Sequence, residues 1–344
     1  MKSDESSTAS PNVWVLQTAR AGDSAQARAL ADELGWPFEL VNLRFNGLYN
    51  IPNSWLGATL GSVNAAEKAQ LTPPWPDLVI AVARRTVPVA RWIKQQSGGT
   101  TRLVHLGRPR LGAKHFDLVI STPQYSVPDA PNVLQLPVPL HGATQSSNST
   151  ELQQRFSHLP RPWTAVLIGG EAWPYRLAGD AAITLASQTA ALTQGNGSVI
   201  ICTSPRTPEA FAQTLCERFE QPAEIAAWQR GSANPYPALL ETADRFIVTG
   251  DSASMLAEAC AREKPVYIYD MPRRALSGLV TGVGGALAQA GILHPPRDMS
   301  KIHQALITGN HAAPLGTHEW HQYKHVPLVG SLAAAADRVR GLFP

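Results

Sequence analysis

A short polar turn between an apolar strand and a helix carries the residue types that suit a phosphate. The turn Thr249–Ser252 follows the apolar run Phe246–Val248, and Asp251 or Ser252 can cap the helix that comes next. Free backbone N–H groups and the positive end of a helix favour an anion at such a turn. Glu258 lies about two turns into the helix, where its carboxylate could reach a ribose hydroxyl. The alternative is an ordinary strand–helix unit with a solvated glutamate.

Polar turns also follow other expected strands in the second half of the chain. Short connections are commonly rich in Gly, Ser, Thr and Pro, so a single turn of this kind indicates little. Carboxyl ends of parallel strands meet at one sheet edge, however, so several turns together favour a ligand site. A diphosphate could be held by small polar groups and an arginine, and a base or sugar by an Asn-Pro-Tyr segment. The residues concerned are Gly169, Gly170, Ser204, Arg206, Thr207, Asn234 and Tyr236.

Three residues of the first half could act on a second substrate. Asp23 stands near the start of the first helix, as an N-cap or as a general base facing an acceptor hydroxyl. Arg84 and Arg85 stand where a strand ends, as solvated side chains or as contacts to that acceptor. His105 lies inside an expected strand, and we interpret it as a core residue.

Strands and helices alternate along the chain, which predicts a parallel, doubly wound α/β architecture. The pattern runs once before a polar and Pro-rich zone at residues 142–162 and then begins again. In the first half we expect strands at Val13–Leu16, Phe38–Val41, Asp77–Val82, Arg102–Leu106, Phe116–Ile120 and Asn132–Leu136, with helices ending at Leu34 and spanning Val87–Gln96. In the second half we expect strands at Thr164–Ile168, Ser198–Cys202, Ile225–Trp228, Phe246–Val248 and Val266–Tyr269, with helices at Ala178–Gln194, Pro208–Phe219, up to Thr242, and at Met299–Thr308 and Val329–Leu342.

This repetition predicts two facing Rossmann-like domains with a ligand in the cleft between them. We expect a disordered lead-in over residues 1–11, an acceptor-side domain over 12–145 and a nucleotide-sugar domain over 160–325. The last helix, within residues 329–344, could pack back on the first domain.

Composition excludes several function classes for this chain of 344 residues. A net charge of +3 without basic and aromatic runs does not indicate nucleic acid. No apolar run reaches the ~20 residues of a membrane span. The three scattered cysteines favour reduced thiols, with Cys202 and Cys260 buried.

P-loop, GxGxxG and GxSxG motifs are missing, and no DxD pair is present to hold a nucleotide-bound Mg²⁺. The histidines His318, His321 and His325 lack companion carboxylates or cysteines, so we predict no metal site and no cofactor.

Several motifs in order resemble the bacterial and plant family named after the mitochondrial fission factor ELM. The core motif is Val248–Ala259, similar to the family's VT-x-DS-x-SM-x-xEA, and the resemblance runs from about Val13 to Pro272. Departures fall at Gly250, Lys264 and Pro205. The other matching segments are Ala21–Asp23 with Gln26, Arg84–Thr86, Pro109–Arg110, Ile168–Gly170, Ser204–Pro208 and Asn234–Tyr236.

The family is similar to GT-B glycosyltransferases, which bind a nucleotide-sugar in their C-terminal domain. The resemblance therefore implies a GT-B-like fold, with phosphate at Ser252 and ribose at Glu258, and it places Gln26 with Asp23 on the acceptor side. It adds Thr249, Asp251, Ser254 and Met255 to the donor-binding set.

We predict a metal-independent, GT-B-type glycosyltransferase that uses a nucleoside-diphosphate sugar, with a cell-envelope glycolipid as acceptor. A nucleotide-sugar epimerase of the same fold is one alternative, and a non-catalytic scaffold in organelle or membrane division is another. We expect a cytoplasmic protein, and the mild basic excess would suit peripheral contact with the inner membrane face.

Overall fold

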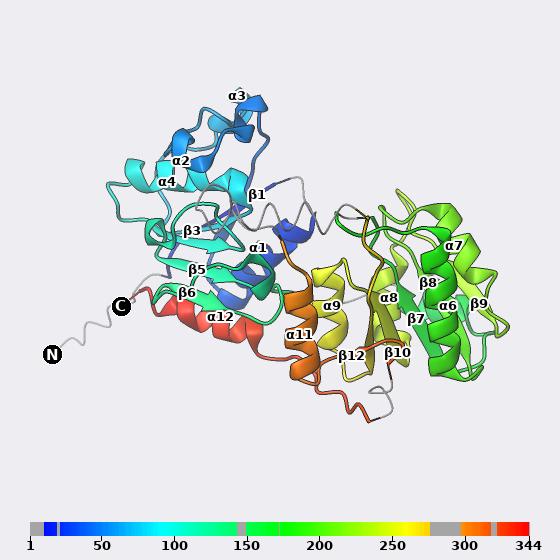
Figure 1. Ribbon diagram of the computed structural model, residues 1–344. Helices are drawn as coiled ribbons and strands as arrows, with labels where there is room; N and C mark the ends of the chain where they lie inside the picture. Colours follow the sequence, from blue (N-terminus) through cyan, green and yellow to red (C-terminus); the bar gives the residue numbers. More distant parts are fainter. Residues whose placement is uncertain are drawn as a thin grey trace. The chain divides into compact units, whose positions relative to one another are not determined.

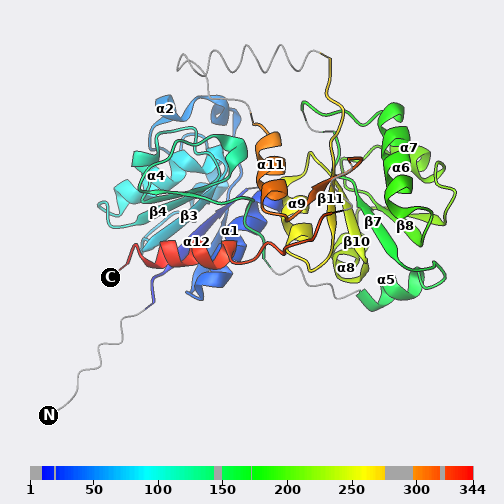
Figure 2. The same cartoon turned by 60° about the horizontal axis from the view of Figure 1, so that its bottom comes forward.

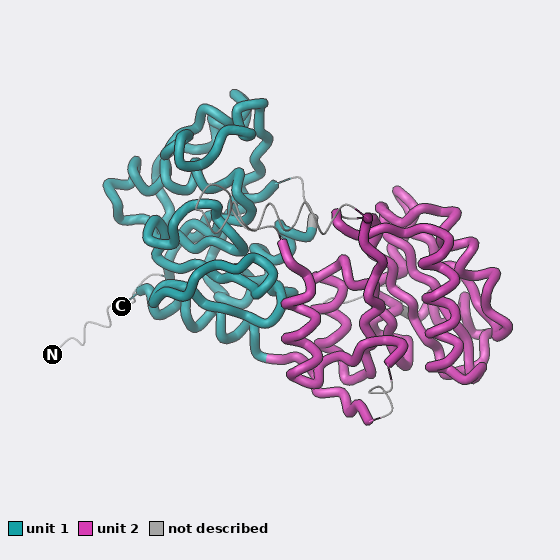
Figure 3. Tube along the Cα trace, viewed as in Figure 1, with its two compact units in different colours: residues 1–142, 330–344 teal, residues 143–329 magenta. Residues whose placement is uncertain are grey.

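The chain folds into two compact units, shown in separate colours in Figure 3. The computed structural model describes residues 10–18, 21–142, 149–171, 173–275, 297–317 and 322–343. Unit 1 comprises residues 1–142 with 330–344, and unit 2 comprises residues 143–329. Most of the expected lead-in, and the histidines His318 and His321, lie outside the described residues.

Unit 1 is built on six parallel strands in the order β2-β1-β3-β4-β5-β6 (Figure 1). β3 is buried along its whole length, as expected for a central strand that is covered on both faces. The strands are β1 (Val13–Gln17), β2 (Phe38–Asn42), β3 (Leu78–Val82), β4 (Arg102–Leu106), β5 (Leu118–Ser121) and β6 (Val133–Gln135).

Alternate side chains of these strands serve two cores, because successive residues of a strand point to opposite faces. Val13 and Val15 pack with α1 and α12, whereas Trp14 and Leu16 pack with α4. The helices of unit 1 are α1 (Ala21–Leu34), α2 (Asn53–Leu56), α3 (Ala65–Lys68), α4 (Val87–Gln96) and α12 (Ser331–Arg340), with 3-10 turns η1 (Gly47–Asn50), η2 (Arg84–Thr86), η3 (Ala113–His115) and η4 (Pro123–Tyr125).

The last helix belongs to unit 1 although it is far from α1 in sequence. Figures 1 and 2 both show α12 beside α1. Ala335, Ala336 and Val339 of α12 are fully buried in the same hydrophobic core as the apolar side chains of α1. The helix starts two residues later than the sequence predicts. Gly330 adopts φ +83, a left-handed conformation that separates it from the helical turns.

Unit 2 repeats the architecture with six parallel strands in the order β12-β11-β10-β7-β8-β9. The strands are β7 (Trp163–Leu167), β8 (Ser198–Cys202), β9 (Ala223–Ala226), β10 (Arg245–Thr249), β11 (Val266–Tyr269) and β12 (Ala313–Pro314). The helices are α5 (Ser149–Arg155), α6 (Gly179–Thr193), α7 (Glu209–Cys216), α8 (Pro235–Thr242), α9 (Ala253–Cys260) and α11 (Ser300–Thr308).

These elements confirm the predicted α/β class and correct some details. The strand expected at Ile225–Trp228 lies two residues earlier, because the Trp228 N–H donates to the Thr203 hydroxyl (2.8 Å) instead of to a neighbouring strand. α5 and the two-residue β12 were not predicted. Cys202 and Cys260 are buried, as expected. Within the described ranges, no helix is both long and apolar enough to cross a bilayer.

Candidate functional site

Three of the predicted turns meet at the carboxyl edge of the unit 2 sheet, where hydrogen bonds join them. The Gly169 N–H after β7 donates to the Thr249 hydroxyl at the end of β10 (2.8 Å). The Ser204 hydroxyl after β8 donates to the Gly169 carbonyl, and the Thr207 hydroxyl donates to the Ile168 carbonyl (3.1 Å). The loops after β7, β8 and β10 therefore form one junction.

Two glycines make this close approach possible. A Cβ atom on Gly169 would lie 2.5 Å from both carboxylate oxygens of Asp251. Gly170 adopts φ +143 and forms a β-bridge with Arg206, and a Cβ there would lie 2.5 Å from the Arg206 Cβ. Only glycine fits at either position without displacing the neighbouring loop.

An ion pair lies at the centre of the junction. Oδ2 of Asp251 lies 3.3 Å from Nη2 of Arg206, and Oδ1 accepts a hydrogen bond from the Thr249 hydroxyl (2.8 Å). The Asp251 side chain is fully buried, which raises its pKa, whereas half of the Arg206 side chain is exposed. Asp251 thus holds Thr249 and Arg206 in place, and Arg206 presents its guanidinium to solvent.

The α9 helix begins at this junction with a cap from Ser252. The Ser252 Oγ atom accepts a hydrogen bond from the Met255 N–H (3.5 Å), and Ser254 and Met255 form the half-buried first turn. His303, which sequence reasoning missed, contacts the Gly250 carbonyl through Nε2 (2.8 Å). Burial lowers the pKa of His303. It comes from α11, 53 residues away, so no local pattern could have indicated this contact.

Tyr236 of α8 and Glu258 of α9 form a second group of predicted donor residues. Asn234 caps α8 by accepting from the Tyr236 N–H (3.2 Å). Burial raises the pKa of the Tyr236 hydroxyl well above 10.0, and the Glu258 carboxylate raises it further. The structure therefore brings together two of the predicted donor residues, one from α8 and one from α9. Asn234 itself is exposed at the helix end.

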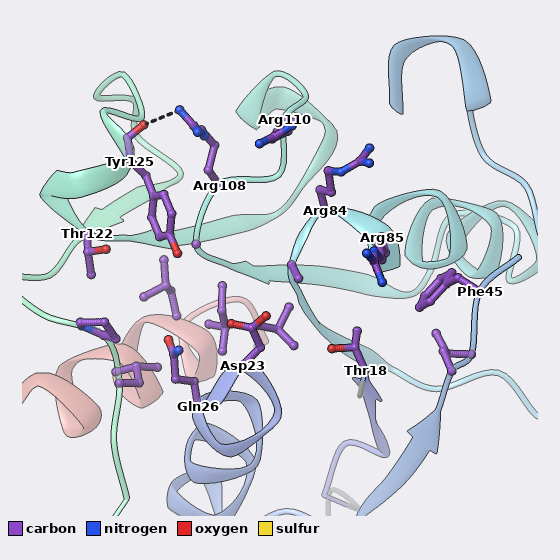
Figure 4. A pocket seen from close by; sticks show the side chains of 18 of the residues that line it. Thr18, Asp23, Gln26, Phe45, Arg84, Arg85, Arg108, Arg110, Thr122 and Tyr125 are labelled. Atoms are coloured by element: carbon purple, nitrogen blue, oxygen red, sulfur yellow. Dashed lines mark hydrogen bonds between the residues drawn. The ribbon is translucent and has the colours of Figure 1, made fainter. Parts of the chain in front are cut away.

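Unit 1 contains a pocket of about 570 Å³ that collects the predicted acceptor-side residues (Figure 4). Asp23 and Gln26 project into it from α1, and Arg84 and Arg85 come from the segment after β3. The sequence reasoning assigned no role to other polar lining residues, which come from the carboxyl ends of β1, β2, β4 and β5. They include Thr18, Arg44, Arg108, Arg110, Thr122 and Tyr125.

Buried polar side chains fix the arginine-bearing segments. The Asn53 amide of α2 donates to the carbonyls of Arg84 and Pro109, each at 2.9 Å. The Thr86 hydroxyl bonds to the carbonyls of Val82 (2.9 Å) and Ala83 (3.0 Å). The segments after β3 and β4 are thereby tied to one amide.

Two aromatic rings also contact the site or its support. The Arg85 guanidinium lies over the ring of Tyr49, 3.8 Å from its centroid. His105 is fully buried, as expected for a core residue, and its Nε2 lies 3.4 Å from the Ala83 carbonyl oxygen. Burial lowers the pKa of His105 to about 4, so the ring is neutral at pH 7.

In the part of the chain that the structure describes, no three His, Cys, Asp or Glu side chains gather in a way that could hold a metal ion. His325 is described, and its Nδ1 lies 2.7 Å from the Tyr323 hydroxyl.

The two parallel six-stranded sheets, each with polar groups at its carboxyl edge, define an α/β protein of GT-B-like fold. The same fold occurs in a UDP-GlcNAc 2-epimerase from Methanocaldococcus jannaschii, at a TM-score of 0.52 and 11% identity over 96% of this chain and 99% of that one. The chain belongs to the mitochondrial fission ELM1 family, whose model matches residues 21–340. This confirms the resemblance noted in the sequence.

Two relatives differ in how much of the chain they match. The uncharacterised protein RP120 of Rickettsia prowazekii is 26% identical over 298 residues, which cover 76% of this chain and 84% of the relative. The mitochondrial fission protein ELM1 of Arabidopsis thaliana is 27% identical over 219 residues, 56% of this chain and 51% of the plant protein. The match thus spans about half of the plant protein.

Proposed function

We propose that this protein is a metal-independent, GT-B-type glycosyltransferase that uses a nucleoside-diphosphate sugar and acts on a cell-envelope glycolipid. The observation that carries the proposal is the junction of three loops in unit 2. There, Arg206 is half exposed and forms an ion pair with Asp251. Asp251 directly precedes Ser252, the N-cap residue of α9. Backbone N–H groups at a helix start and an arginine together suit a diphosphate.

Six of the predicted donor residues have specific roles in this proposal. The diphosphate binds at Arg206 and Ser252, and Gly169 and Gly170 let the backbone approach it. Glu258 accepts a hydrogen bond from a ribose hydroxyl, and Tyr236 beside it orients that carboxylate or stacks on the base. The fold that is shared with a UDP-GlcNAc 2-epimerase supports a uridine nucleotide as the first candidate.

The transfer step uses Asp23 in the unit 1 pocket. An acceptor hydroxyl gives its proton to the Asp23 carboxylate and bonds to the anomeric carbon through its oxygen. The bond from that carbon to the diphosphate breaks, and the diphosphate leaves with the electron pair. Arg206 and the N-terminus of α9 stabilise the leaving charge. A glycolipid acceptor would place the protein in the cytoplasm, at the inner membrane face.

A thermal-shift and titration series tests the donor assignment. We expect a nucleoside diphosphate or its sugar to raise the melting temperature of the wild type. Glu258→Ala should weaken this binding by about tenfold or more, the effect of losing one charge-assisted hydrogen bond. Glu263→Ala, which changes an exposed glutamate just after α9, is the matched control and should bind as the wild type does. Undiminished binding by Glu258→Ala would exclude the donor assignment.

Asp23→Asn separates binding from chemistry. It should retain nucleotide binding and abolish transfer, because the amide cannot take the proton of the acceptor. Transfer at the wild-type rate in this variant would remove Asp23 from the reaction.

Nucleotide-sugar epimerisation is the second candidate, favoured by the fold that the chain shares with the Methanocaldococcus jannaschii enzyme. An epimerase needs no acceptor. Incubation of UDP-GlcNAc alone, followed by NMR of the sugar, would reveal a new epimer for this activity and unchanged sugar for a transferase.

A non-catalytic scaffold is the third candidate function, suggested by the name of the plant relative. It predicts that no nucleotide-sugar changes the melting temperature.

A further inference from the structure

The unit 1 pocket gathers more positive charge than a neutral acceptor would require. Arg84 and Arg85 line it from the segment after β3, and Arg108 and Arg110 line it from the segment after β4. Arg44 also lines the pocket, but it is ion-paired with Glu67. Asp23 is the one acidic side chain among the lining residues. Besides that of Arg44, four guanidinium groups thus share the pocket with one carboxylate.

The arginines are close enough to repel one another. Burial, followed by the charges of Arg110 and Arg85, lowers the pKa of Arg84. Burial and the charge of Arg110 likewise lower the pKa of Arg108. Among the described residues, no carboxylate lies within salt-bridge distance of Arg84, Arg85 or Arg110. Like charges held together in a half-buried site favour an anion as ligand.

The backbone holds this arrangement in strained conformations. Ala83, directly before Arg84, has φ 63 and ψ 157, a region that is almost confined to glycine. Arg110 itself has φ 53. Such conformations are unfavourable and persist where the surroundings enforce them. Here Asn53 enforces them, because its amide binds the carbonyls of both arginine-bearing segments.

Apolar side chains also line the pocket. Leu136, Val138 and Leu140 line it from the segment after β6, together with Ile120 at the end of β5. A ligand that suits both kinds of lining residue carries an anionic group next to an apolar or weakly polar portion.

We infer that the acceptor is bound through a phosphate group, held by the cluster of Arg84, Arg85, Arg108 and Arg110. This inference rests on the proposed transferase function and specifies the class of its second substrate, a phosphate-bearing amphiphile. A phosphate monoester carries up to two negative charges and three acceptor oxygens, which suits several guanidinium groups better than one carboxylate does.

Titration calorimetry on the full chain at low salt tests the inference with three probes that share a three-carbon polyol skeleton: glycerol 3-phosphate, glycerate and glycerol. We expect glycerol 3-phosphate to bind at least about tenfold more tightly than glycerate, and glycerol not to bind measurably. Hexyl phosphate should bind more tightly than glycerol 3-phosphate because the apolar wall contacts its chain. Equal binding of the phosphate and the carboxylate, or no binding of glycerol 3-phosphate, would overturn the assignment.

Arginine variants locate the bound phosphate. Arg84→Gln and Arg110→Gln should each weaken glycerol 3-phosphate binding by about tenfold, the loss of one charge-assisted contact. Arg28→Gln is the matched control, because Arg28 lies on α1 with an exposed side chain paired to Asp32. Arg206→Gln, in unit 2, tests the alternative that the phosphate binds at the proposed donor site instead. Binding that depends on Arg206 and not on Arg84 or Arg110 would refute the inference.

The two proposals fail separately in this design. Loss of UDP binding in Glu258→Ala, with unchanged glycerol 3-phosphate binding, supports the donor site in unit 2. If the wild type binds no nucleotide but binds glycerol 3-phosphate through Arg84 and Arg110, the transferase function fails and the phosphate pocket stands. Two arginine variants are used, so that the misfolding of one does not decide the result. Thermal melting followed by circular dichroism checks that each variant is folded.

Discussion

Arg206 and Asp251 form an ion pair in which only one partner reaches solvent. Nη2 of Arg206 lies 3.3 Å from Oδ2 of Asp251, with half of the arginine side chain exposed and none of the aspartate side chain. A phosphate that binds to Arg206 must share it with this carboxylate. Burial raises the pKa of Asp251, even though Thr249 and Arg206 act in the opposite direction. The same ion pair therefore affects two properties: the stability of the loop junction and the strength with which Arg206 binds an anion.

The raised pKa of Asp251 predicts how acidity changes stability. A carboxyl group whose pKa is higher in the folded state contributes stability below its unfolded value, near 3.8, and loses it as pH rises through the folded value. Asp251→Asn has no such titration. Its free energy of unfolding should therefore rise relative to the wild type between pH 4 and neutrality, as measured by urea titration at a series of pH values. Asp180→Asn, at an exposed aspartate, is the control, and a parallel pH profile in wild type and Asp251→Asn would contradict the prediction.

Gly169→Ala should damage the junction itself. The new methyl group would lie 2.5 Å from the Asp251 carboxylate, so the loops after β7 and β10 must separate. We expect a loss of about 1–3 kcal/mol in the free energy of unfolding, together with weaker nucleotide binding. Gly179→Ala is the matched control, because a Cβ at the first residue of α6 meets no atom within 4 Å. Equal stability of the two variants would show that the junction tolerates separation.

The sequence predicts the sheets well because buried parallel strands are recognisable as apolar runs. β4 and β8 have the predicted bounds, since each is a mainly apolar run between polar turns, and α4 has its predicted bounds as an amphipathic segment. β12 escapes prediction because two residues at a sheet edge carry no periodic signal. The rule that strand ends share an edge also led to the expectation that the turns at Gly169, Ser204 and Thr249 would lie together, and hydrogen bonds join them.

The arginine pocket and its support were harder to predict. Arg84 and Arg85 stand at a recognisable strand end. Arg108 and Arg110 reach the same pocket because β4 pairs with β3, which the sequence around them does not indicate. Asn53 sits in a segment with no periodicity, and its two partners are 31 and 56 residues away. Contacts between distant segments depend on tertiary packing, which a single sequence does not encode in local patterns.

Ala83→Gly should stabilise the protein, which is unusual for a glycine substitution. Ala83 has φ 63 and ψ 157, where a Cβ is unfavourable by roughly 1–3 kcal/mol. Glycine removes that strain and loses about 1 kcal/mol or less through the entropy of the unfolded chain. We expect a net gain of about 1 kcal/mol in the free energy of unfolding, measured in urea. Ala333→Gly, at an exposed position within α12, should instead lose about 1 kcal/mol. A loss in both variants would mean that the Ala83 backbone is relaxed.

Asn53→Asp should be more harmful than Asn53→Ala, although aspartate has the shape of asparagine. The Asn53 amide donates to two carbonyl oxygens, those of Arg84 and Pro109. A carboxylate in its place accepts only, so two buried carbonyls would face a negative charge. Alanine leaves the two carbonyls without a donor, and we expect it to lose about 1–3 kcal/mol of stability. Aspartate should exceed that loss. Both variants should weaken glycerol 3-phosphate binding, and an aspartate variant as stable as the wild type would remove Asn53 from this role.

His105→Gln should make the protein less sensitive to acid. The His105 ring is fully buried, and burial lowers its pKa from 6.5 to about 4. A histidine with a lowered folded pKa contributes stability above its unfolded pKa and loses it as pH falls through the folded value. The wild type should therefore lose about 3 kcal/mol from this residue between pH 6.5 and pH 4, on the scale of 1.36 kcal/mol per pKa unit. Glutamine does not titrate, so the free energy of unfolding of the variant should change less over that interval, whatever its value at pH 7. His158→Gln, at an exposed histidine, should retain the wild-type slope. If His105→Gln retains that slope as well, the acid sensitivity arises from other groups.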